Sequence, residues 1–379
     1  MTLNMPEICF FWLTMGTYHY ARMNALVEAG LSVRVIELTD KDDHFWELKE
    51  DAQFERITLH HELLSDELLT KNIDQVLNAI GSDSDKIIVN GAGFFNLKFN
   101  FALSRHAGKS DIKLLLWSES TLYDNSTNFL KKLAKRYAVS AYDASLVAGK
   151  RHRTYLEKHG MKPGKIYEVG NVVENKSFEP TDEVSKKARR NFLFVGRLLT
   201  IKGVDLLLYS FARYRDLCEL HKMLPWELTI CGDGPEMKYL KGIAKNMEID
   251  EYVKFKGNLQ PKDIRKEYLN HAVFILPSLS EPWGLVVNEA MASSLPVIVS
   301  ENCGCVPELV HESDNGFRFI PDRENPQILA ELMLRIQKDP ELRSYMASQS
   351  SKIIKNFTPK TYAQKCSEAF QDVLKSDEE

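Results

Sequence analysis

The sequence has no long apolar run. No segment approaches the ~20 apolar residues that a membrane-spanning helix needs. The N-terminus has only a short apolar stretch with Glu7 before it, whereas a secretory signal needs a basic start and a longer apolar core. We therefore expect a cytoplasmic protein whose contact with the inner membrane surface, where there is any, is peripheral.

Cysteine is also scarce, with six residues among 379, and no C-x-x-C pair marks a zinc site. Cys303 and Cys305 could pair or bind a metal, or could simply stand in a loop that tolerates small residues. Reduced thiols suit a cytoplasmic protein.

There is no excess of basic residues either. The formal net charge is −4, so we expect no nucleic-acid partner.

Internal repeats and low-complexity segments are absent as well. Hydrophobic residues make up 44% of the chain and charged residues 27%, which is typical of globular proteins and excludes the fibrous and disordered classes. A chain of 379 residues is too long for one ordinary core and suits two domains.

Short apolar runs alternate with amphipathic helical stretches along the chain. Unbroken apolar runs indicate strands buried on both faces, and helices between them indicate parallel sheets. The pattern predicts an α/β, doubly wound fold, with strands at 8–13, 32–38, 86–90, 113–117, 146–148, 191–195, 227–231, 252–255, 272–276, 296–299 and 316–319, and helices at 20–28, 65–80, 127–137, 204–217, 326–338 and 358–374.

The polar stretch 175–190, which contains Pro180 and has no apolar period, indicates a linker between two α/β domains. We expect an N-terminal domain at 1–178 and a C-terminal domain at 186–357. Two such domains facing each other would bind ligands in a cleft, at the carboxyl ends of their strands.

Segment 194–203 places a glycine and two cations just after an apolar strand. Gly196 lets the backbone approach a ligand, Arg197 can fork across phosphate oxygens, and Lys202 is a compact positive charge. By itself this is also the pattern of a solvated basic loop.

Segment 277–292 runs from the end of a strand into a helix that Gly284 opens. The first helical amides, at Leu285 and Val286, have no partner within the helix and suit a phosphate. Glu281 precedes the helix and Glu289 lies one to two turns inside it, so both could face one ligand. Two surface carboxylates are the plainer alternative.

Two further strand ends carry glycine turns. Gly232 and Gly234 follow one strand, and Asn258 and Leu259 follow another, at the edge where a nucleotide base would lie. In this order and together with the two segments above, they make residues 191–315 resemble the retaining glycosyltransferases of family 4. These enzymes have the GT-B fold, two Rossmann-like domains around a cleft. The resemblance is close over this third of the chain and only topological before it.

The resemblance implies a hexosyltransferase, of the kind that serves polysaccharide biosynthesis. It would move a sugar from a nucleotide-diphosphate sugar to a saccharide or lipid-linked glycan, retaining the anomeric configuration and using no metal or other cofactor. Arg197 and Lys202 would neutralise the diphosphate, Glu281 would contact the sugar and Glu289 the ribose. The backbone at 284–286 would contact phosphate or sugar, and the C-terminal helix, at about 358–379, would join the first domain.

Breaking the bond to the leaving diphosphate builds negative charge there, which preorganised positive charge stabilises. Arg197, Lys202 and the helix N-terminus could supply this charge without a metal. The metal-binding pattern D-x-D occurs at 83–85, remote from these motifs, where we expect a solvated turn. The family favours attack on the same face of the sugar, with the departing phosphate oxygen taking the proton, so Glu281 need not be a nucleophile.

The N-terminal half departs from the family in two places. The glycine-rich loop after the first strand is reduced to Gly16, which could still approach the donor diphosphate or the acceptor. Tyr18 and His19 could contact the acceptor or pack at a helix start. Ser118 and Glu119 stand where many members have a histidine facing the donor sugar, and they could bind acceptor hydroxyls or a donor amine. Residues 91–95 follow another strand and could line the same cleft.

Residues 129–165 are rich in Lys and Arg, although the chain is acidic overall. A helix there places Leu130, Leu133 and Tyr137 on one face among basic residues. This face could dock on anionic lipid, where a lipid-linked acceptor would be found, or it could be an ordinary solvated face.

Two other functions stay open at this point. One is a nucleotide-sugar 2-epimerase on the same fold, and the other is a catalytically silent scaffold that binds nucleotide sugars. The spacing of Arg197 and Lys202 relative to Glu281 and Glu289 argues against the epimerase, and the complete donor set argues against the scaffold.

Overall fold

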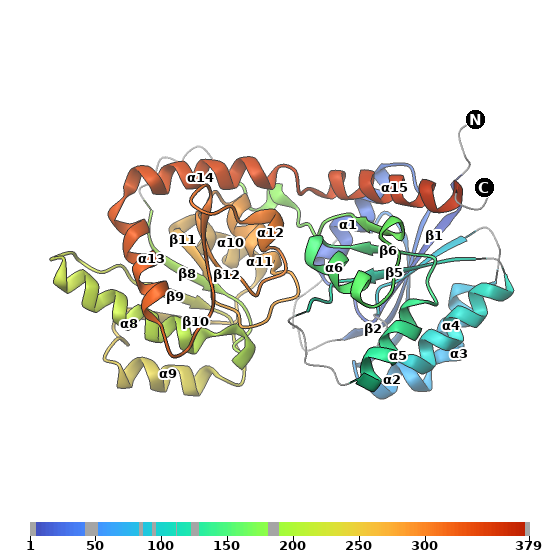
Figure 1. Cartoon of the computed structure of the whole chain (residues 1–379), viewed down its shortest axis with the longest axis horizontal. Coiled ribbons are helices and arrows are strands. Elements are labelled where there is room, and N and C mark those ends of the chain that lie inside the picture. Colours follow the sequence, from blue (N-terminus) through green and yellow to red (C-terminus); the bar gives the residue numbers. More distant parts are fainter. Residues whose placement is uncertain are drawn as a thin grey trace. The chain divides into compact units, whose positions relative to one another are not determined.

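The computed structural model describes residues 5–41, 52–82, 86–92, 96–110, 112–122, 129–180 and 189–375. The chain divides into two compact units. Unit 1 comprises Met1–Val173 and Thr358–Glu379, and unit 2 comprises Glu174–Phe357 (Figure 1). Residues 174–178, which we expected in the first domain, therefore lie in unit 2, while the C-terminal helix lies in unit 1.

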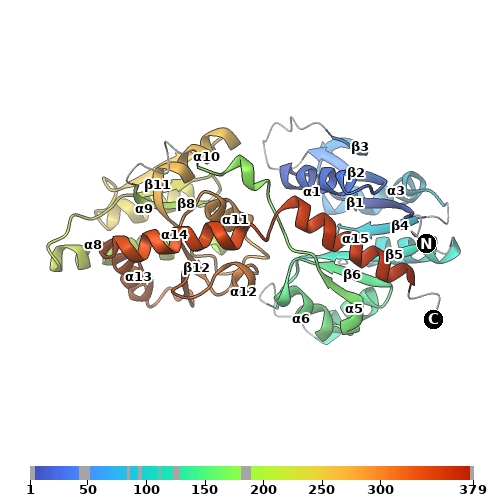
Figure 2. The ribbon, with the colours of Figure 1, turned by 90° about the horizontal axis from the view of Figure 1, so that it is seen from above.

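Unit 1 is a parallel sheet of seven strands between two layers of helices. Its elements are β1 (Glu7–Trp12), α1 (Thr17–Glu28), β2 (Val33–Lys41), β3 (Glu55–Leu63), α2 (Asp66–Lys71), α3 (Ile73–Ile80), β4 (Lys86–Asn90), α4 (Leu97–Lys109), β5 (Lys113–Ser118), α5 (Phe129–Val139), β6 (Ala144–Val147), α6 (Lys150–Lys158), β7 (Ile166–Glu168) and α15 (Pro359–Lys375). The strand order is β3-β2-β1-β4-β5-β6-β7. Helices α1 and α15 cover one face, and α2 to α6 cover the other (Figures 1 and 2).

The central strands of unit 1 are buried along almost their whole length, which is why they are unbroken apolar runs in the sequence. Two strands escaped prediction. β3 is half-exposed at the edge of the sheet and mixes charged with apolar residues, and β7 has only three residues.

The single helix that the sequence predicts over 65–80 is wrong, because the structure has two helices there. They meet at Asn72, whose side-chain amide donates to the carbonyl of Leu68 at 2.8 Å. The backbone N–H of Asn72 donates to Leu69 at 3.2 Å. Both bonds cap the end of α2 and turn the chain before α3 begins.

Unit 2 is a second parallel sheet, of six strands. Its elements are β8 (Arg190–Val195), α8 (Val204–Leu220), β9 (Leu228–Cys231), α9 (Met237–Asn246), β10 (Val253–Gly257), α10 (Pro261–Asn270), β11 (His271–Leu276), α11 (Leu285–Ala292), β12 (Val297–Ser300), α12 (Val306–Leu309), β13 (Gly316–Phe319), α13 (Gln327–Lys338) and α14 (Pro340–Ile354). The strand order is β10-β9-β8-β11-β12-β13. α8, α9 and α13 cover one face, and α10, α11 and α14 cover the other (Figures 1 and 2).

The six cysteines are free, buried thiols, so Cys303 and Cys305 form no disulfide. None of the helices in the described part of the chain combines the length and apolar character that crossing a bilayer requires.

Candidate functional site

Four loops at the carboxyl edge of the unit 2 sheet are joined by backbone hydrogen bonds. Leu198, in the loop after β8, donates to Asp233, in the loop after β9, at 2.8 Å. Leu279, in the loop after β11, donates to Ile201 at 2.8 Å. Glu281 accepts from Gly304, in the loop after β12, at 2.9 Å. Motifs that the sequence places far apart therefore lie next to one another at this edge of unit 2.

Glycine is required where these loops cross. A Cβ at Gly232 would lie 1.9 Å from the carbonyl oxygen of Gly196, and a Cβ at Gly203 would lie 2.4 Å from that of Pro277. Both glycines also have positive φ, 131° and 64°. The glycine motifs thus have a structural cause, which is direct contact between one backbone and another.

Lys202 and Glu281 are in contact. Lys202 ends the short 3-10 helix Thr200–Lys202, and its Nζ forms an ion pair with Oε2 of Glu281 in the loop between β11 and α11. Ser278 Oγ lies 3.4 Å from the same oxygen. The two side chains are only 15% and 10% exposed, so the pair is shielded from most of the solvent.

Arg197 has a different environment, although it belongs to the same loop as Lys202. It is exposed, and within the described ranges its guanidinium has no hydrogen-bond or ion-pair partner. A cation in this state can meet an anionic ligand without first breaking an internal contact.

Helix α11 begins where we predicted. Gly284 is its N-cap, with φ of 99°, and a Cβ there would lie 3.1 Å from Cδ2 of Leu276. The backbone amides of Leu285 and Val286, at the first two helical positions, donate to no other described residue. They can therefore donate to an anion at the helix N-terminus.

Glu289 lies inside α11 and is buried, unlike a surface carboxylate. Its Oε2 accepts a hydrogen bond of 2.8 Å from the hydroxyl of Tyr268, a buried residue of α10 that the sequence analysis did not select. Glu281 and Glu289 therefore have different environments. Glu281 lies next to a lysine, and Glu289 lies next to a tyrosine. After β10, Asn258 is exposed and Leu259 is half-buried.

In unit 1, aromatic side chains gather at the carboxyl ends of β1 and β5. The rings of Trp12 and Trp117 lie 6.0 Å apart, and the ring of His19 lies 4.4 Å from Trp12. Gly91 leaves space for the Trp12 ring, because a Cβ there would lie 2.1 Å from it. Of the stretch 91–95, residues 93–95 lie outside the described part of the chain, as does the sequence at 83–85.

His19 takes the helix-start role that we weighed against acceptor contact. Its Nδ1 accepts from the N–H of Gly16, the N-cap of α1, at 2.9 Å. Burial lowers the pKa of His19 to about 3, and the charge of nearby Arg22 adds to this effect. The imidazole is therefore neutral near pH 7. Tyr18 is half-buried and its carbonyl accepts from Arg22 Nε, and contact between either residue and an acceptor stays a prediction.

Glu119 is held by donors from two segments. Its Oε1 accepts from Trp117 Nε1 at 3.2 Å and from Asn171 Nδ2 at 2.8 Å. Asn171 follows β7 and carried no signal in the sequence, since a lone asparagine in a loop is common. Ser118 is buried at the end of β5, and its hydroxyl accepts from the N–H of Ser120.

The described residues contain no cluster of three or more His, Cys, Asp or Glu side chains that could hold a metal ion. Cys231, at the end of β9, is no candidate ligand. Burial is the main cause that raises the pKa of its thiol to about 12, and the carboxylate of Glu267 adds to it, so the thiol stays protonated.

The basic stretch 129–165 includes an exposed face of α5. Leu133 and Tyr137 are 48% and 64% exposed, and Lys132 and Arg136 beside them are also exposed. The pKa of His159 is lowered, mainly by burial and to a smaller extent by the charges of Lys135, Lys132 and Arg136. The side chain of Leu130 lies outside the described ones.

Comparisons with known proteins identify the enzyme class. Residues 175–353 match the family model described as glycosyl transferases group 1. An uncharacterized glycosyltransferase of Haemophilus influenzae is 26% identical over 354 residues, which cover 91% of this chain and 94% of that protein.

Two solved structures share the fold. Sucrose-phosphate synthase of Thermosynechococcus elongatus superposes with a TM-score of 0.78 at 17% identity, covering 98% of this chain and 100% of that one. HepE of Anabaena, solved in complex with UDP, superposes with a TM-score of 0.75 at 18% identity, covering 96% and 99%. The fold is thus the predicted GT-B fold of two Rossmann-like domains, and the chain is an enzyme of the glycosyltransferase class.

Proposed function

We propose that this chain is a retaining glycosyltransferase of family 4 that takes its sugar from a UDP-sugar and needs no metal ion. UDP is the nucleotide in the structure of HepE, which shares the fold. Unit 2 is the donor-binding unit in this proposal. Saccharides and lipid-linked glycans are the proposed acceptors.

The contact between Lys202 and Glu281 carries the proposal. It places a cation and a carboxylate side by side, next to a helix N-terminus whose first amides have no acceptor among the described residues. The cation and the amides of Leu285 and Val286 suit a diphosphate, and the carboxylate suits the hydroxyls of the sugar attached to it. A diphosphate sugar presents both kinds of group within one molecule.

The reaction follows from these charges. The bond between the sugar and the diphosphate breaks, and its electron pair stays on the phosphate oxygen. The acceptor hydroxyl attacks the sugar from the same face, and its proton passes to the departing phosphate oxygen. Arg197, Lys202 and the two amides stabilise the growing negative charge, which is the part of a metal-independent mechanism that the protein must supply.

The first test is binding of nucleotide sugars, measured by thermal shift with UDP-, GDP-, ADP- and dTDP-sugars, with and without EDTA. A ligand that binds only the folded state raises the melting temperature by mass action. We expect a shift for UDP-sugars that EDTA does not change. A shift that EDTA abolishes would refute metal independence, and no shift with any donor would refute the donor site. Binding without transfer would favour the silent scaffold.

Product analysis separates the remaining alternatives. A transferase converts the UDP-sugar to UDP and a glycoside with the anomeric configuration of the donor, and NMR of the product reports that configuration. Interconversion of UDP-GlcNAc and UDP-ManNAc without an acceptor would instead identify a 2-epimerase.

We propose that a lipid-linked acceptor is met at an anionic membrane surface, through the exposed face of α5. Leu133 and Tyr137 would enter the headgroup region while Lys132 and Arg136 neutralise phosphates. Co-sedimentation with vesicles containing anionic lipid, but not with zwitterionic vesicles, is the expected result. A variant with Lys132→Glu and Arg136→Glu should lose it.

A further inference from the structure

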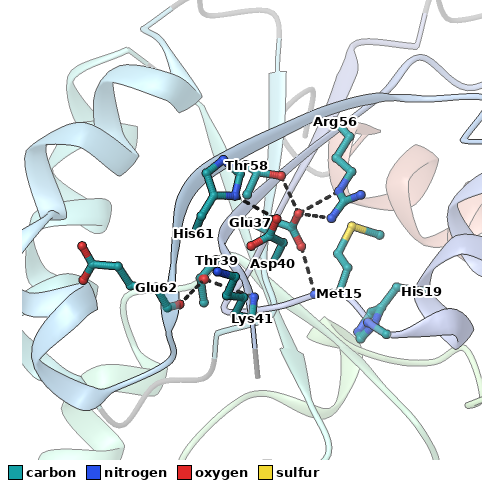
Figure 3. A network of polar contacts seen from close by, with 11 residues as sticks. Met15, His19, Glu37, Thr39, Asp40, Lys41, Arg56, Thr58, His61 and Glu62 are labelled. Atoms are coloured by element: carbon teal, nitrogen blue, oxygen red, sulfur yellow. Dashed lines mark hydrogen bonds and ion pairs between the residues drawn. The ribbon is translucent and has the colours of Figure 1, made fainter. Parts of the chain in front are cut away.

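Glu37 is a fully buried carboxylate in β2, a strand whose interior is otherwise mostly apolar. In the sheet it is the register partner of Trp12, the last residue of β1. Its side chain therefore lies beside the loop at 13–16, which connects β1 to α1 and contains Gly16 (Figure 3).

The two oxygens of Glu37 serve different neighbours. Oε2 accepts from the backbone N–H of Met15 at 3.1 Å. Oε1 accepts from Arg56 Nε at 2.7 Å and from Thr58 Oγ1 at 2.6 Å, and Arg56 Nη2 forms an ion pair with it. Figure 3 shows these donors around the carboxylate of Glu37. Glu37 thus links the loop to β3, on which Arg56 and Thr58 lie.

Arg56 also neutralises the negative charge of Glu37. A carboxylate buried alone would be costly, and near the N-terminus of α1 it would repel an anionic substrate. The Arg56 guanidinium compensates the charge of Glu37, and it lies over the ring of Tyr20 in α1, 5.5 Å from the ring centre.

The loop is tied at two other points. The carbonyl of Leu13 accepts from the N–H of Thr39 at 3.1 Å, and the N–H of Gly16 donates to His19 at 2.9 Å. This loop has a single glycine, so its backbone has less conformational freedom than that of a glycine-rich loop. Side chains from β2 and α1 fix its position.

We propose that Glu37 is a positioning residue of the substrate site. It holds Met15, and through it Gly16, in a fixed position at the carboxyl edge of the unit 1 sheet, and it does not touch the substrate itself. This inference rests on the proposed function and on the prediction from the sequence that Gly16 contacts the substrate.

Glutamine alone cannot replace Glu37. The oxygen of its amide could accept a hydrogen bond on one side. Its N–H₂ group, which only donates, would then face another hydrogen-bond donor on the other side. Removing the cation at the same time should solve this conflict. In the double variant Glu37→Gln with Arg56→Met, the amide oxygen can accept from Met15 while its nitrogen donates to Thr58 Oγ1.

The experiment compares Glu37→Ala, the double variant and Glu55→Ala in the full-length protein. Glu55 is the control, a β3 carboxylate that is 54% exposed and pairs with Arg34. Labelling the eleven methionines with ¹⁵N permits amide hydrogen exchange to be followed at Met15. The same samples are assayed for kcat/KM of UDP-sugar transfer.

In Glu37→Ala we expect exchange at Met15 to accelerate about tenfold or more, and kcat/KM to fall by a similar factor. The double variant should stay within about threefold of wild type in both measurements, and Glu55→Ala should change neither.

Three results would overturn the inference. Unchanged exchange at Met15 in Glu37→Ala would mean that Glu37 does not hold the loop. Faster exchange with unchanged kcat/KM would mean that the loop is not part of the site. A double variant that protects Met15 but transfers poorly would mean that charge, not position, is what matters. Absence of transfer by the wild type would instead refute the proposed function, while exchange at Met15 would still report whether Glu37 holds the loop.

Discussion

Replacing Lys202 by methionine should weaken UDP binding while keeping the packing of the aliphatic stem. A hydrogen bond to a charged group contributes about 1.5–3 kcal/mol, which corresponds to a loss of affinity of about 10- to 150-fold. The same change leaves Glu281, whose side chain is only 10% exposed, without its cation. Because both ends keep some contact with water, we expect a destabilisation of about 1–3 kcal/mol, below that of a fully buried pair.

The two effects can be separated by a second substitution. In the variant Lys202→Met with Glu281→Gln, the unpaired carboxylate is gone. The fall in Tm, about 2–10 °C for the single variant of a unit of this size, should therefore mostly disappear. The affinity for UDP should stay low, since the cation that binds phosphate is still missing.

Glu281→Gln alone supplies the matching control. It should bind UDP about as well as wild type and lose affinity only for the sugar-bearing donor, because the carboxylate is proposed to contact the sugar. Titration calorimetry with UDP and UDP-glucose measures both. UDP binding by Lys202→Met within about threefold of wild type would refute the assignment of this lysine to the diphosphate.

Three further changes test other parts of the molecule. Gly232→Ala should destabilise the protein by about 2 kcal/mol or more, because its Cβ would overlap the Gly196 carbonyl. The control Gly242→Ala, on an exposed part of α9 with open space around it, should stabilise the protein by about 0.5–1 kcal/mol. Denaturant unfolding measures both. Because His19 has a pKa of about 3 when folded and about 6.5 when unfolded, the unfolded state takes up a proton first as the pH falls below 6.5. Between pH 7 and pH 4 the wild type should therefore lose about 1–3 kcal/mol more of its free energy of unfolding than His19→Phe does. Equal losses in the two proteins would contradict the argument that burial lowers the pKa of His19. Glu119→Ala should lower kcat/KM of transfer by about tenfold or more, and an unchanged value would remove this carboxylate from the acceptor site.

Most of the fold could be predicted from the sequence because its strands are buried on both faces. Runs such as Phe192–Val195 have no polar face, and only a sheet between two helical layers suits them. β3 has a different physical situation. At the edge of the sheet its exposed and half-buried residues include the charged Glu55 and Arg56 among apolar neighbours, and such a segment looks like a surface loop.

The candidate site was only partly predictable, for a reason of distance along the chain. Glycines and cations at strand ends pointed to Gly232 and Lys202, but the contact of Lys202 with Glu281 spans 79 positions and needs the fold. Glu37 left one usable signal, a carboxylate inside an apolar strand, which indicates a buried partner. Its partner Arg56 could not be named, because the strand that carries it was not predicted.

The C-terminal helix has a consequence for how the chain is made. Unit 2 is one continuous segment, so it can fold as soon as it leaves the ribosome. Unit 1 leaves first but must wait for α15, whose Tyr362, Cys366 and Phe370 are buried in it. Unit 1 is therefore completed only once α15 has been made, so a premature stop codon before Pro359 would leave the part that was synthesised earlier without one of its helices.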